Sequence, residues 1–247
     1  MQQTAVTALR VLDEVARRQP IGVTQLALQM GMNKSTMHRT LRALEETGWI
    51  RQAGGGDTGW VLTTKPIDMA RHVAADTGLR DHARGSMAAL RDQTGESVHL
   101  AVREGTEVVI IDVEESASPI RIHWPVGTRS ACHATATGKA ILAFLSPGEL
   151  DDVLGDGLTG FTDATITEKD SLLADLDAVR RRGYSIAEGE LREDIASIAA
   201  PILGRTGTPL ASMSVFLPIH RMPADGGKTL GEQVREAAAV ISGKFRI

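Results

Sequence analysis

The stretch TQLALQMGMNKSTMHRTLRALEETGWI, residues 24–50, decides the fold of the first part of this 247-residue chain. Its apolar residues recur at helical spacing, which predicts a short helix from residue 24 and a longer one over about 33–47. Gly31 and Gly48 follow these helices, where glycine readily takes the left-handed conformation that ends a helix. The stretch therefore predicts two helices joined by a tight turn.

The second helix has one apolar side and one basic, hydrogen-bonding side. Thr24 and Asn33 are residue types that cap helix starts, so we expect them to begin the two helices. The apolar stripe is formed by Met37, Leu41 and Leu44. The opposite side carries Lys34, Ser35, His38, Arg39 and Arg42, which suits the major groove of DNA. A plain helical hairpin with a solvated basic face is the alternative.

A two-stranded wing is expected to follow the helices. Residues 49–50 and 60–62 predict short strands, and the glycine-rich segment 52–59 predicts the turn between them. Arg51 at the root of the turn could reach a phosphate or a minor groove, but a solvated surface arginine is equally consistent. Upstream, one face of a leading helix is formed by Ala5, Leu9, Leu12 and Ala16. The predicted DNA-contacting residues are Thr24, Lys34, Ser35, Thr36, His38, Arg39, Arg42 and Arg51.

Charge is divided unevenly along the chain. The formal net charge is −4, yet residues 1–65 hold eight Lys and Arg against five Asp and Glu. A basic N-terminal part on an acidic body suits a protein that touches DNA at one end. No apolar run is long enough for a membrane span, and the first predicted helix leaves no room for a signal peptide. With a single cysteine, Cys132, we expect a cytoplasmic protein without an internal disulfide.

The rest of the chain predicts a linking helix and a mixed α/β body. Pro66 can start a helix that runs to Thr77, and Ile67, Ala70 and Val73 lie on one side of it. Helices are predicted over 79–93, from about 134, over 147–154, from Thr167 to Gly183, and around 230–241. Strands are predicted over 97–103, 108–113, 120–124, 195–203 and 210–218. Short turns between strands exclude parallel crossovers, so the sheet should be mainly antiparallel with helices against it.

Two separate segments resemble the IclR family of bacterial transcription regulators. The first is ALRVLDEVA with GVTQLALQMGMNKSTMHRTLRALEETGWI, and the second is SACHATATGKAILAF with GYSIAEGELREDIASIAAPI. The resemblance implies an α+β protein: a winged helix-turn-helix domain (1–64), a linker helix (65–79) and a GAF-like effector-binding domain (80–247). It also implies a homodimer, often a dimer of dimers, that binds operator DNA under the control of a small metabolite. Thr7 stands where the family usually has arginine.

The resemblance also implies where the effector binds. Carried over by motif, with Trp124 and Glu190 added from the sequence, the candidate residues are Ile122, Trp124, Ser130, Ala136, Thr137, Glu190, Ile195, Ser197 and Ser214. The backbone N–H groups at the helix start near Thr135 could receive an effector carboxylate, because the helix dipole favours an anion there. The serine hydroxyls could instead bond to their own backbone. We expect an organic or aromatic acid.

Other chemistries fit the body less well. GKA at 138–140 lacks the earlier glycine and the following Ser or Thr of a phosphate-binding loop. Cys132 and His133 are adjacent, with no further Cys or His at metal-ligand spacing, so a buried cysteine and a capping histidine are favoured over a metal or thiol site. We predict no cofactor, metal or catalytic activity. A DNA-binding part fused to a metabolite-processing enzyme is the main alternative, and a winged helix used only for protein contacts is another.

Overall fold

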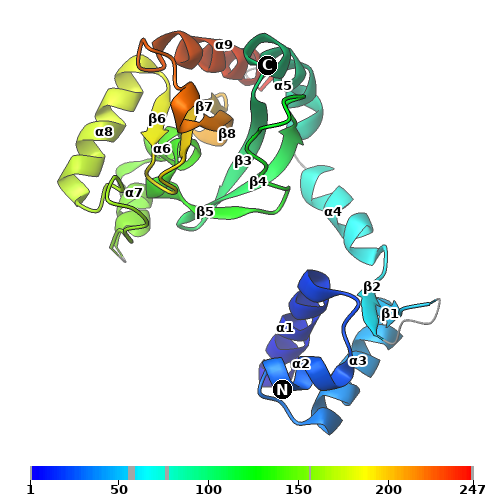
Figure 1. The fold of residues 1–247 in the computed structure, drawn as a ribbon. Coiled ribbons are helices and arrows are strands. Elements are labelled where there is room, and N and C mark those ends of the chain that lie inside the picture. The colour runs from blue at the N-terminus through cyan, green and yellow to red at the C-terminus, as the bar shows by residue number, and fades with distance from the viewer. Residues whose placement is uncertain (1, 55–58, 76–77, 156, 246–247) are drawn as a thin grey trace. The chain divides into compact units, whose positions relative to one another are not determined.

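The computed structural model describes residues 2–54, 59–75, 78–155 and 157–245, with backbone only for residues 2–3 and 71–75. Contacts divide the chain into two compact units, Met1–Thr77 and Gly78–Ile247 (Figure 1). Each unit has its own buried core, as expected for parts that fold around separate hydrophobic centres. Within the described residues, no helix has the length and apolar character needed to cross a bilayer.

The N-terminal unit consists of helices and a two-stranded antiparallel hairpin. Its elements are α1 (Gln2–Arg18), α2 (Val23–Gln29), α3 (Lys34–Glu46), β1 (Ile50–Gln52), β2 (Trp60–Leu62) and α4 (Lys65–Ala75). Ile50 pairs with Leu62 and Gln52 with Trp60. The predicted helix-turn-helix, wing strands and linking helix are thus present. The wing turn at 55–58 and the predicted helix end at 76–77 lie outside the described residues.

The core of this unit confirms the stripe on α3 and corrects the face of α1. Its buried apolar side chains are Val11, Val15, Ile21, Leu26, Ala27, Met37, Leu41, Leu44, Ile50 and Trp60. On α1, Val11 and Val15 point inward, whereas Ala5, Val6, Leu9 and Ala16 are exposed and Leu12 is half-buried. The expected face was wrong because the helix offers two apolar sides, and it is the side with Val11 and Val15 that packs into the core.

The turn glycines behave as predicted and Asn33 takes its predicted cap position, but Thr24 does not. Gly31 and Gly48 have φ of +61° and +76°, the left-handed conformation that closes α2 and α3. Asn33 is at the N-cap position of α3 without a capping side-chain bond. The cap assigned to Thr24 is wrong: α2 begins one residue earlier, after Gly22, so Thr24 already lies inside its first turn.

The C-terminal unit is one antiparallel sheet with helices on both faces. Its helices are α5 (Leu79–Thr94), α6 (Ala136–Leu142), α7 (Pro147–Leu154), α8 (Lys169–Arg182) and α9 (Lys228–Lys244), with short 3-10 turns η1 (Cys132–Ala134) and η2 (Ile219–Arg221). Its strands are β3 (Ser97–Glu104), β4 (Glu107–Glu114), β5 (Arg129–Ala131), β6 (Ser185–Glu188), β7 (Ile195–Leu203) and β8 (Pro209–Pro218). The strand order is β5-β4-β3-β8-β7-β6, and every neighbouring pair is antiparallel.

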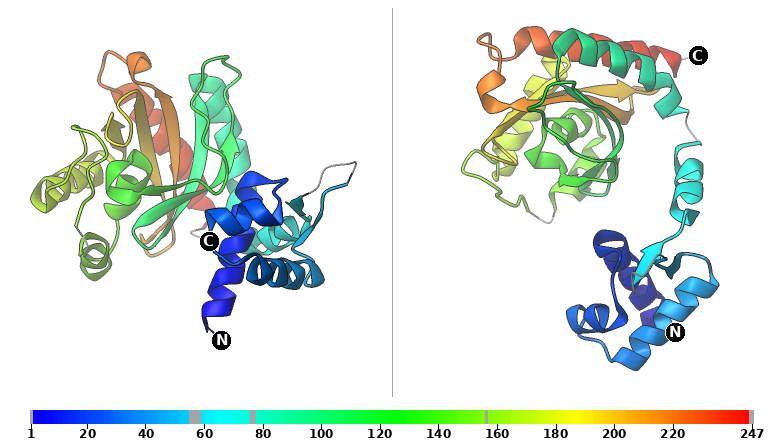
Figure 2. Two further views of the ribbon diagram at one scale, coloured as in Figure 1. Left: turned by 60° about the horizontal axis from the view of Figure 1, so that its bottom comes forward. Right: turned by 45° about the vertical axis from the view of Figure 1, so that its right-hand side comes forward.

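The two faces of the sheet carry different cores. Helices α5 and α9 cover one face, with Met87, Leu90, Val234 and Ile241 packed on alternate residues of β3, β7 and β8. Helices α6, α7 and α8 lie on the other side (Figure 2). Because side chains alternate along a strand, Ser214 and Phe216 of β8 face the α6 side while Met213 and Val215 face α5 and α9.

Two expectations for this unit were wrong, and two strands were missed. Residues 120–124 form no strand; the segment lies between Pro119 and Pro125, which lack the N–H that a sheet ladder requires. Edge pairing with β4 is made instead by β5, which is too short to show alternation. The N-cap of α8 is Glu168 rather than Thr167. Strand β6 was also missed, since its four residues mix apolar and polar types.

Candidate DNA-binding surface and ligand pocket

The polar side of α3 is exposed. Met37, Leu41 and Leu44 bury the opposite side, so helical geometry turns the predicted contact residues outward. The exposed members are Lys34, Ser35, His38, Arg39 and Arg42. None of these five has an ion-pair or side-chain hydrogen-bond partner within the described ranges. Their charges and hydrogen-bonding groups are therefore available to an anionic partner.

The other three predicted contact residues differ in accessibility. Thr24 is exposed in the first turn of α2. Thr36 is half-buried, and its carbonyl accepts a bond from the Thr40 hydroxyl. Arg51 is exposed on β1 and donates to the Gln52 carbonyl at 3.1 Å, a bond that phosphate could readily replace. Thr36 is the least suited of the three to reach a base.

A groove runs between α1 and α3. It is lined by Thr4, Thr7, Ala8, Met32, Thr36, Arg39, Thr40 and Ala43 and encloses about 490 Å³. Thr7 of α1 and Arg39 of α3 therefore both line this groove. An arginine at position 7 would add a second cation beside Arg39, so its replacement by threonine lowers the positive charge of this surface.

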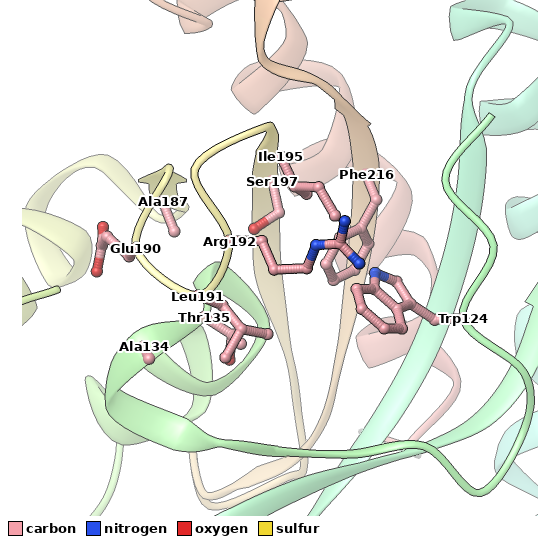
Figure 3. Close-up of a pocket in the computed structure, with 10 residues that line it drawn as sticks. All are labelled: Trp124, Ala134, Thr135, Ala187, Glu190, Leu191, Arg192, Ile195, Ser197 and Phe216. Carbon is pink, nitrogen blue, oxygen red and sulfur yellow. The ribbon is translucent and has the colours of Figure 1, made fainter. Parts of the chain in front are cut away.

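On the α6 side of the sheet, two adjoining hollows meet around Trp124 and Phe216. The first hollow is lined by Trp124, Ala134, Thr135, Ala187, Glu190, Leu191, Arg192, Ile195, Ser197 and Phe216 (Figure 3). The second is lined by Val108, Ile110, Trp124, Thr128, Ser130, Thr135, Thr137, Leu191 and Phe216. They share Trp124, Thr135, Leu191 and Phe216, so the two hollows form one mostly apolar pocket.

Six of the nine predicted effector residues line this pocket. They are Trp124, Ser130, Thr137, Glu190, Ile195 and Ser197. The other three do not line it. Ile122 lies two residues before Trp124 on the covering segment, and Ala136 is packed against Ala140, Ala187 and Ala199. Ser214 is fully buried in β8, and its hydroxyl donates to the carbonyl of His99 on the neighbouring strand β3 at 3.5 Å, not to its own backbone.

Glu190 is engaged by a buried cation instead of facing the pocket centre. Its Oε1 accepts from Nζ of Lys139 at 2.7 Å, and Nζ also lies 2.9 Å from Asp175 of α8. Lys139 is only 1% exposed, so this ion pair is almost dry. In Figure 3 the Glu190 carboxylate points away from Trp124 and Phe216. Burial raises the pKa of Glu190 even though Lys139 opposes this, and the group holds α6, α8 and the β6–β7 connection together.

Three of the pocket residues that were not predicted from the sequence shape it most. Leu191 and Phe216 form the wall shared by the two hollows, and Arg192 places its guanidinium carbon 5.9 Å from the centre of the Trp124 ring. Arg192 also pairs with Asp194 at 3.1 Å, on the exposed side. The signal was present in the segment GELRED, where a leucine and an arginine follow directly after the motif residue Glu190.

The start of α6 and the cysteine have structural roles. The hydroxyl of Thr135 caps α6 by accepting from the N–H of Gly138 at 3.0 Å. Cys132 is buried, and burial raises the pKa of its thiol to about 12, so it stays a neutral thiol at ordinary pH. His133 contacts the Thr159 carbonyl through Nε2 at 2.9 Å. Cys132 and His133 are therefore not arranged as a nucleophile and its base.

Fold and site together define a bacterial-type transcription regulator: a helix-turn-helix unit that presents cations, joined to a unit with a ligand pocket. Residues 4–54 match the model of the IclR helix-turn-helix domain, and residues 71–243 match that of the bacterial transcriptional regulator IclR C-terminal domain. The chain belongs to the IclR family. The predictions of a DNA-binding, ligand-responsive regulator and of a non-enzyme are confirmed by this membership.

Relatives resemble the chain over nearly its whole length. The HTH-type transcriptional regulator BhcR of Paracoccus denitrificans is 33% identical over 236 residues, covering 95% of this chain and 84% of the relative. The crystal structure of the Thermotoga maritima IclR protein superposes with a TM-score of 0.84 at 28% identity, with all of both chains covered. An IclR homologue of Microbacterium hydrocarbonoxydans complexed with 4-hydroxybenzoate has a TM-score of 0.83 at 24% identity, covering 98% and 99% of the two chains.

Proposed function

We propose that α3 reads operator DNA and that a small organic or aromatic acid, bound in the pocket around Trp124 and Phe216, controls this binding. The observation that carries the DNA part is the row of exposed cations on α3, which have no ion-pair or side-chain hydrogen-bond partner among the residues that the structure describes. The division of labour that we propose is residues 1–64 for DNA, 65–79 as linker and 80–247 for effector and assembly. The protein would act in the cytoplasm, where its operator lies.

The pocket supports an acid of modest size. Its walls are mostly apolar, with a few polar side chains and the cation Arg192, which is the composition of small-molecule sites. The free space inside each hollow is only about 10 Å³, so a small ring or short chain would enter only after the side chains around Trp124 and Phe216 move apart. The 4-hydroxybenzoate complex of the Microbacterium homologue supports this class of ligand.

We further propose a homodimer, with pairing of dimers as a second step. One unit presents one reading helix, which supplies one half-site of sequence information. Exposed apolar side chains on α1 and α4 offer a surface for pairing: Val6, Leu9, Ile67 and Met69. Specific binding to a two-fold related operator would follow from the symmetry of the dimer.

The experiment is a gel shift of the full-length protein on the upstream region of its own gene, with and without small acids. A thermal-shift screen selects the acids, because a ligand that binds only the folded state raises the melting temperature. We expect specific retention of operator DNA and a change in its affinity with at least one stabilising acid. Binding that is equal on unrelated DNA of the same length would contradict an operator function.

A further inference from the structure

A separate cavity lies on the face of the sheet that helices α5 and α9 cover side by side (Figure 2). Its walls come from the end of α5, the residue before β3, the end of β8, η2 and the start of α9. This α5–α9 cavity encloses about 350 Å³, a volume found in small-molecule sites. None of its described lining residues belongs to the pocket around Trp124 and Phe216. A ligand of this cavity would therefore be distinct from the proposed effector.

Glu96 leaves one buried oxygen open in the α5–α9 cavity. The residue lines the cavity and is only 9% exposed. Its Oε1 accepts from Nη1 of Arg221 at 3.0 Å, whereas Oε2 has no hydrogen-bonding partner among the residues that the structure describes. A carboxylate oxygen that is removed from water and left without a donor is costly. The open oxygen therefore indicates a place for a donor that the described chain does not supply.

Asp225, the second carboxylate of the cavity, has no such opening. Its Oδ1 accepts from the N–H of Gly227 at 2.9 Å, and its Oδ2 accepts from the N–H and the hydroxyl of Thr229 at 2.9 and 2.6 Å. The bonds from Thr229 and Gly227 lower the pKa of Asp225 and keep it ionised. Asp225 thus holds the start of α9 and contributes only its negative charge to a ligand.

The charges of the lining favour a cation. Glu96 and Asp225 carry two negative charges against the single positive charge of Arg221. Arg221 is already held by Glu96 and, through Nη2 at 3.4 Å, by the hydroxyl of Ser118, so it has little left for an anion. A metal ion would need several open oxygens, and no group of three suitable side chains occurs within the described ranges. A protonated amine needs only one charged acceptor and balances the excess charge.

The rest of the cavity suits a short hydrocarbon chain. Leu217 and Leu230, both nearly buried, line it, and Gln93 and Gln233 add amide groups. We propose that the α5–α9 cavity binds a small alkylammonium compound. Its ammonium group donates to Oε2 of Glu96, and its hydrocarbon chain lies against the two leucines. Such an ammonium group belongs either to a simple amine or to an α-amino acid.

The test is calorimetric titration of the full-length protein with 3-methylbutylamine and with 3-methylbutan-1-ol, which has a hydroxyl in place of the ammonium group. We expect the amine to bind about tenfold more tightly, because a charged hydrogen bond is lost in the alcohol. Leucine, which is the same amine with an added carboxylate, separates the two sources. Binding as tight as that of the amine identifies an amino acid, and weaker binding identifies an amine without a carboxylate.

The variants locate the site. Glu96→Gln should lower the affinity for the amine about tenfold and leave that for the alcohol unchanged, because the acceptor stays but its charge is lost. Glu232→Gln makes the same change of charge on α9, at an exposed residue outside the cavity, and should bind like the parent. Gln93→Trp, at an exposed position of the lining, should fill the cavity and weaken both probes; it serves if Glu96→Gln does not fold.

Two results for the probes would overturn the inference: equal affinity of the parent protein for amine and alcohol, or an amine affinity that neither Glu96→Gln nor Gln93→Trp changes. An equal loss in Glu96→Gln and Glu232→Gln would also overturn it, because the amine would then be attracted by the overall negative charge alone. The proposed control of operator binding by an acid does not depend on this cavity, so it stands or falls separately.

Discussion

At the scale of single residues, position along α3 separates two kinds of DNA contact. Arg39 lies opposite the buried stripe of α3 and lines the groove with Thr7, whereas Arg42 is one turn nearer the end of the helix. The N-terminal half of a recognition helix usually contacts base edges, and its later residues meet phosphates. Both guanidinium groups are exposed, so their loss should leave the fold intact.

We expect Arg39→Ala to reduce operator affinity by roughly 1–3 kcal/mol and to lower discrimination between operator and altered sequences, because a base-edge contact is lost. Arg42→Ala should weaken all DNA sequences alike and make the salt dependence shallower, because a phosphate contact is lost. Fluorescence anisotropy at several salt concentrations measures both. If each variant binds operator like the parent, α3 is not the reading helix.

His99 makes stability depend on pH. Burial lowers its pKa from 6.5 to about 4 in the folded protein, so between these values the unfolded chain binds a proton that the folded protein does not. Stability contributed by the neutral imidazole is therefore lost as the pH falls below about 6.5 and levels off below about 4. Between pH 7 and pH 5, this amounts to about 2 kcal/mol.

His99→Leu should remove this slope. Urea denaturation of parent and variant at pH 7 and pH 5 gives the comparison, and we expect the variant to gain about 2 kcal/mol relative to the parent at the lower pH. Subtracting the pH dependence of the variant's unfolding free energy from that of the parent cancels the titration of Glu115, His123 and other shared groups. An identical pH dependence of both proteins would mean that His99 titrates normally.

At the scale of elements, the start of α6 depends on a close backbone approach. A Cβ on Gly138 would lie 2.2 Å from the carbonyl oxygen of Cys132, so η1 and α6 can pack this tightly only around glycine. The same tight turn places Thr135 and Thr137 at the pocket. Gly148, in the first turn of α7, would place a Cβ within 4 Å of nothing outside its own helix.

We expect Gly138→Ala to destabilise the protein by about 2 kcal/mol or more, since neighbouring backbone must move. Gly148→Ala is the matched control and should be neutral or stabilise by up to about 1 kcal/mol, because alanine favours helix. Thermal unfolding of both variants decides. Equal melting temperatures of the two variants would show that the backbone at the η1–α6 contact can move without loss of stability.

The sequence predicted the elements with strong periodicity and failed where tertiary context decides. The stripe of α3, the long strands β7 and β8 and the helix α9 repeat apolar residues often enough to be read directly. The short edge strands β5 and β6 do not, and the apolar segment 120–124 resembled a strand although its flanking prolines keep it out of the sheet. Secondary structure of short segments depends on neighbours that a single sequence does not reveal.

The pocket was predictable only where its residues lie in sequence motifs. Trp124, Thr137 and Ser197 could be chosen because they lie in or beside recognisable motifs. Phe216 could not, since only the folded sheet brings β8 to the same hollow as the β6–β7 connection.

At the scale of the whole molecule, the distribution of charge and apolar surface favours assembly. The N-terminal unit carries a modest positive charge, so one copy attracts few phosphates and reads one half-site. The same unit exposes Leu9 by 62% and Ile67 by 66%, large apolar side chains that water solvates poorly. Pairing through α1 and α4 would cover these side chains and double the number of reading helices.

We therefore expect the full-length protein to be at least a dimer at micromolar concentration without DNA, and light scattering measures this directly. Leu9→Glu combined with Ile67→Glu should shift the mass toward the monomer and weaken operator binding, because the charges would be buried in the pairing surface. Val240→Glu, on the exposed side of α9, is the matched control outside that surface. A monomeric mass of 26.4 kDa for the parent protein would exclude the dimer, and an unchanged mass in the double variant would place the pairing surface elsewhere.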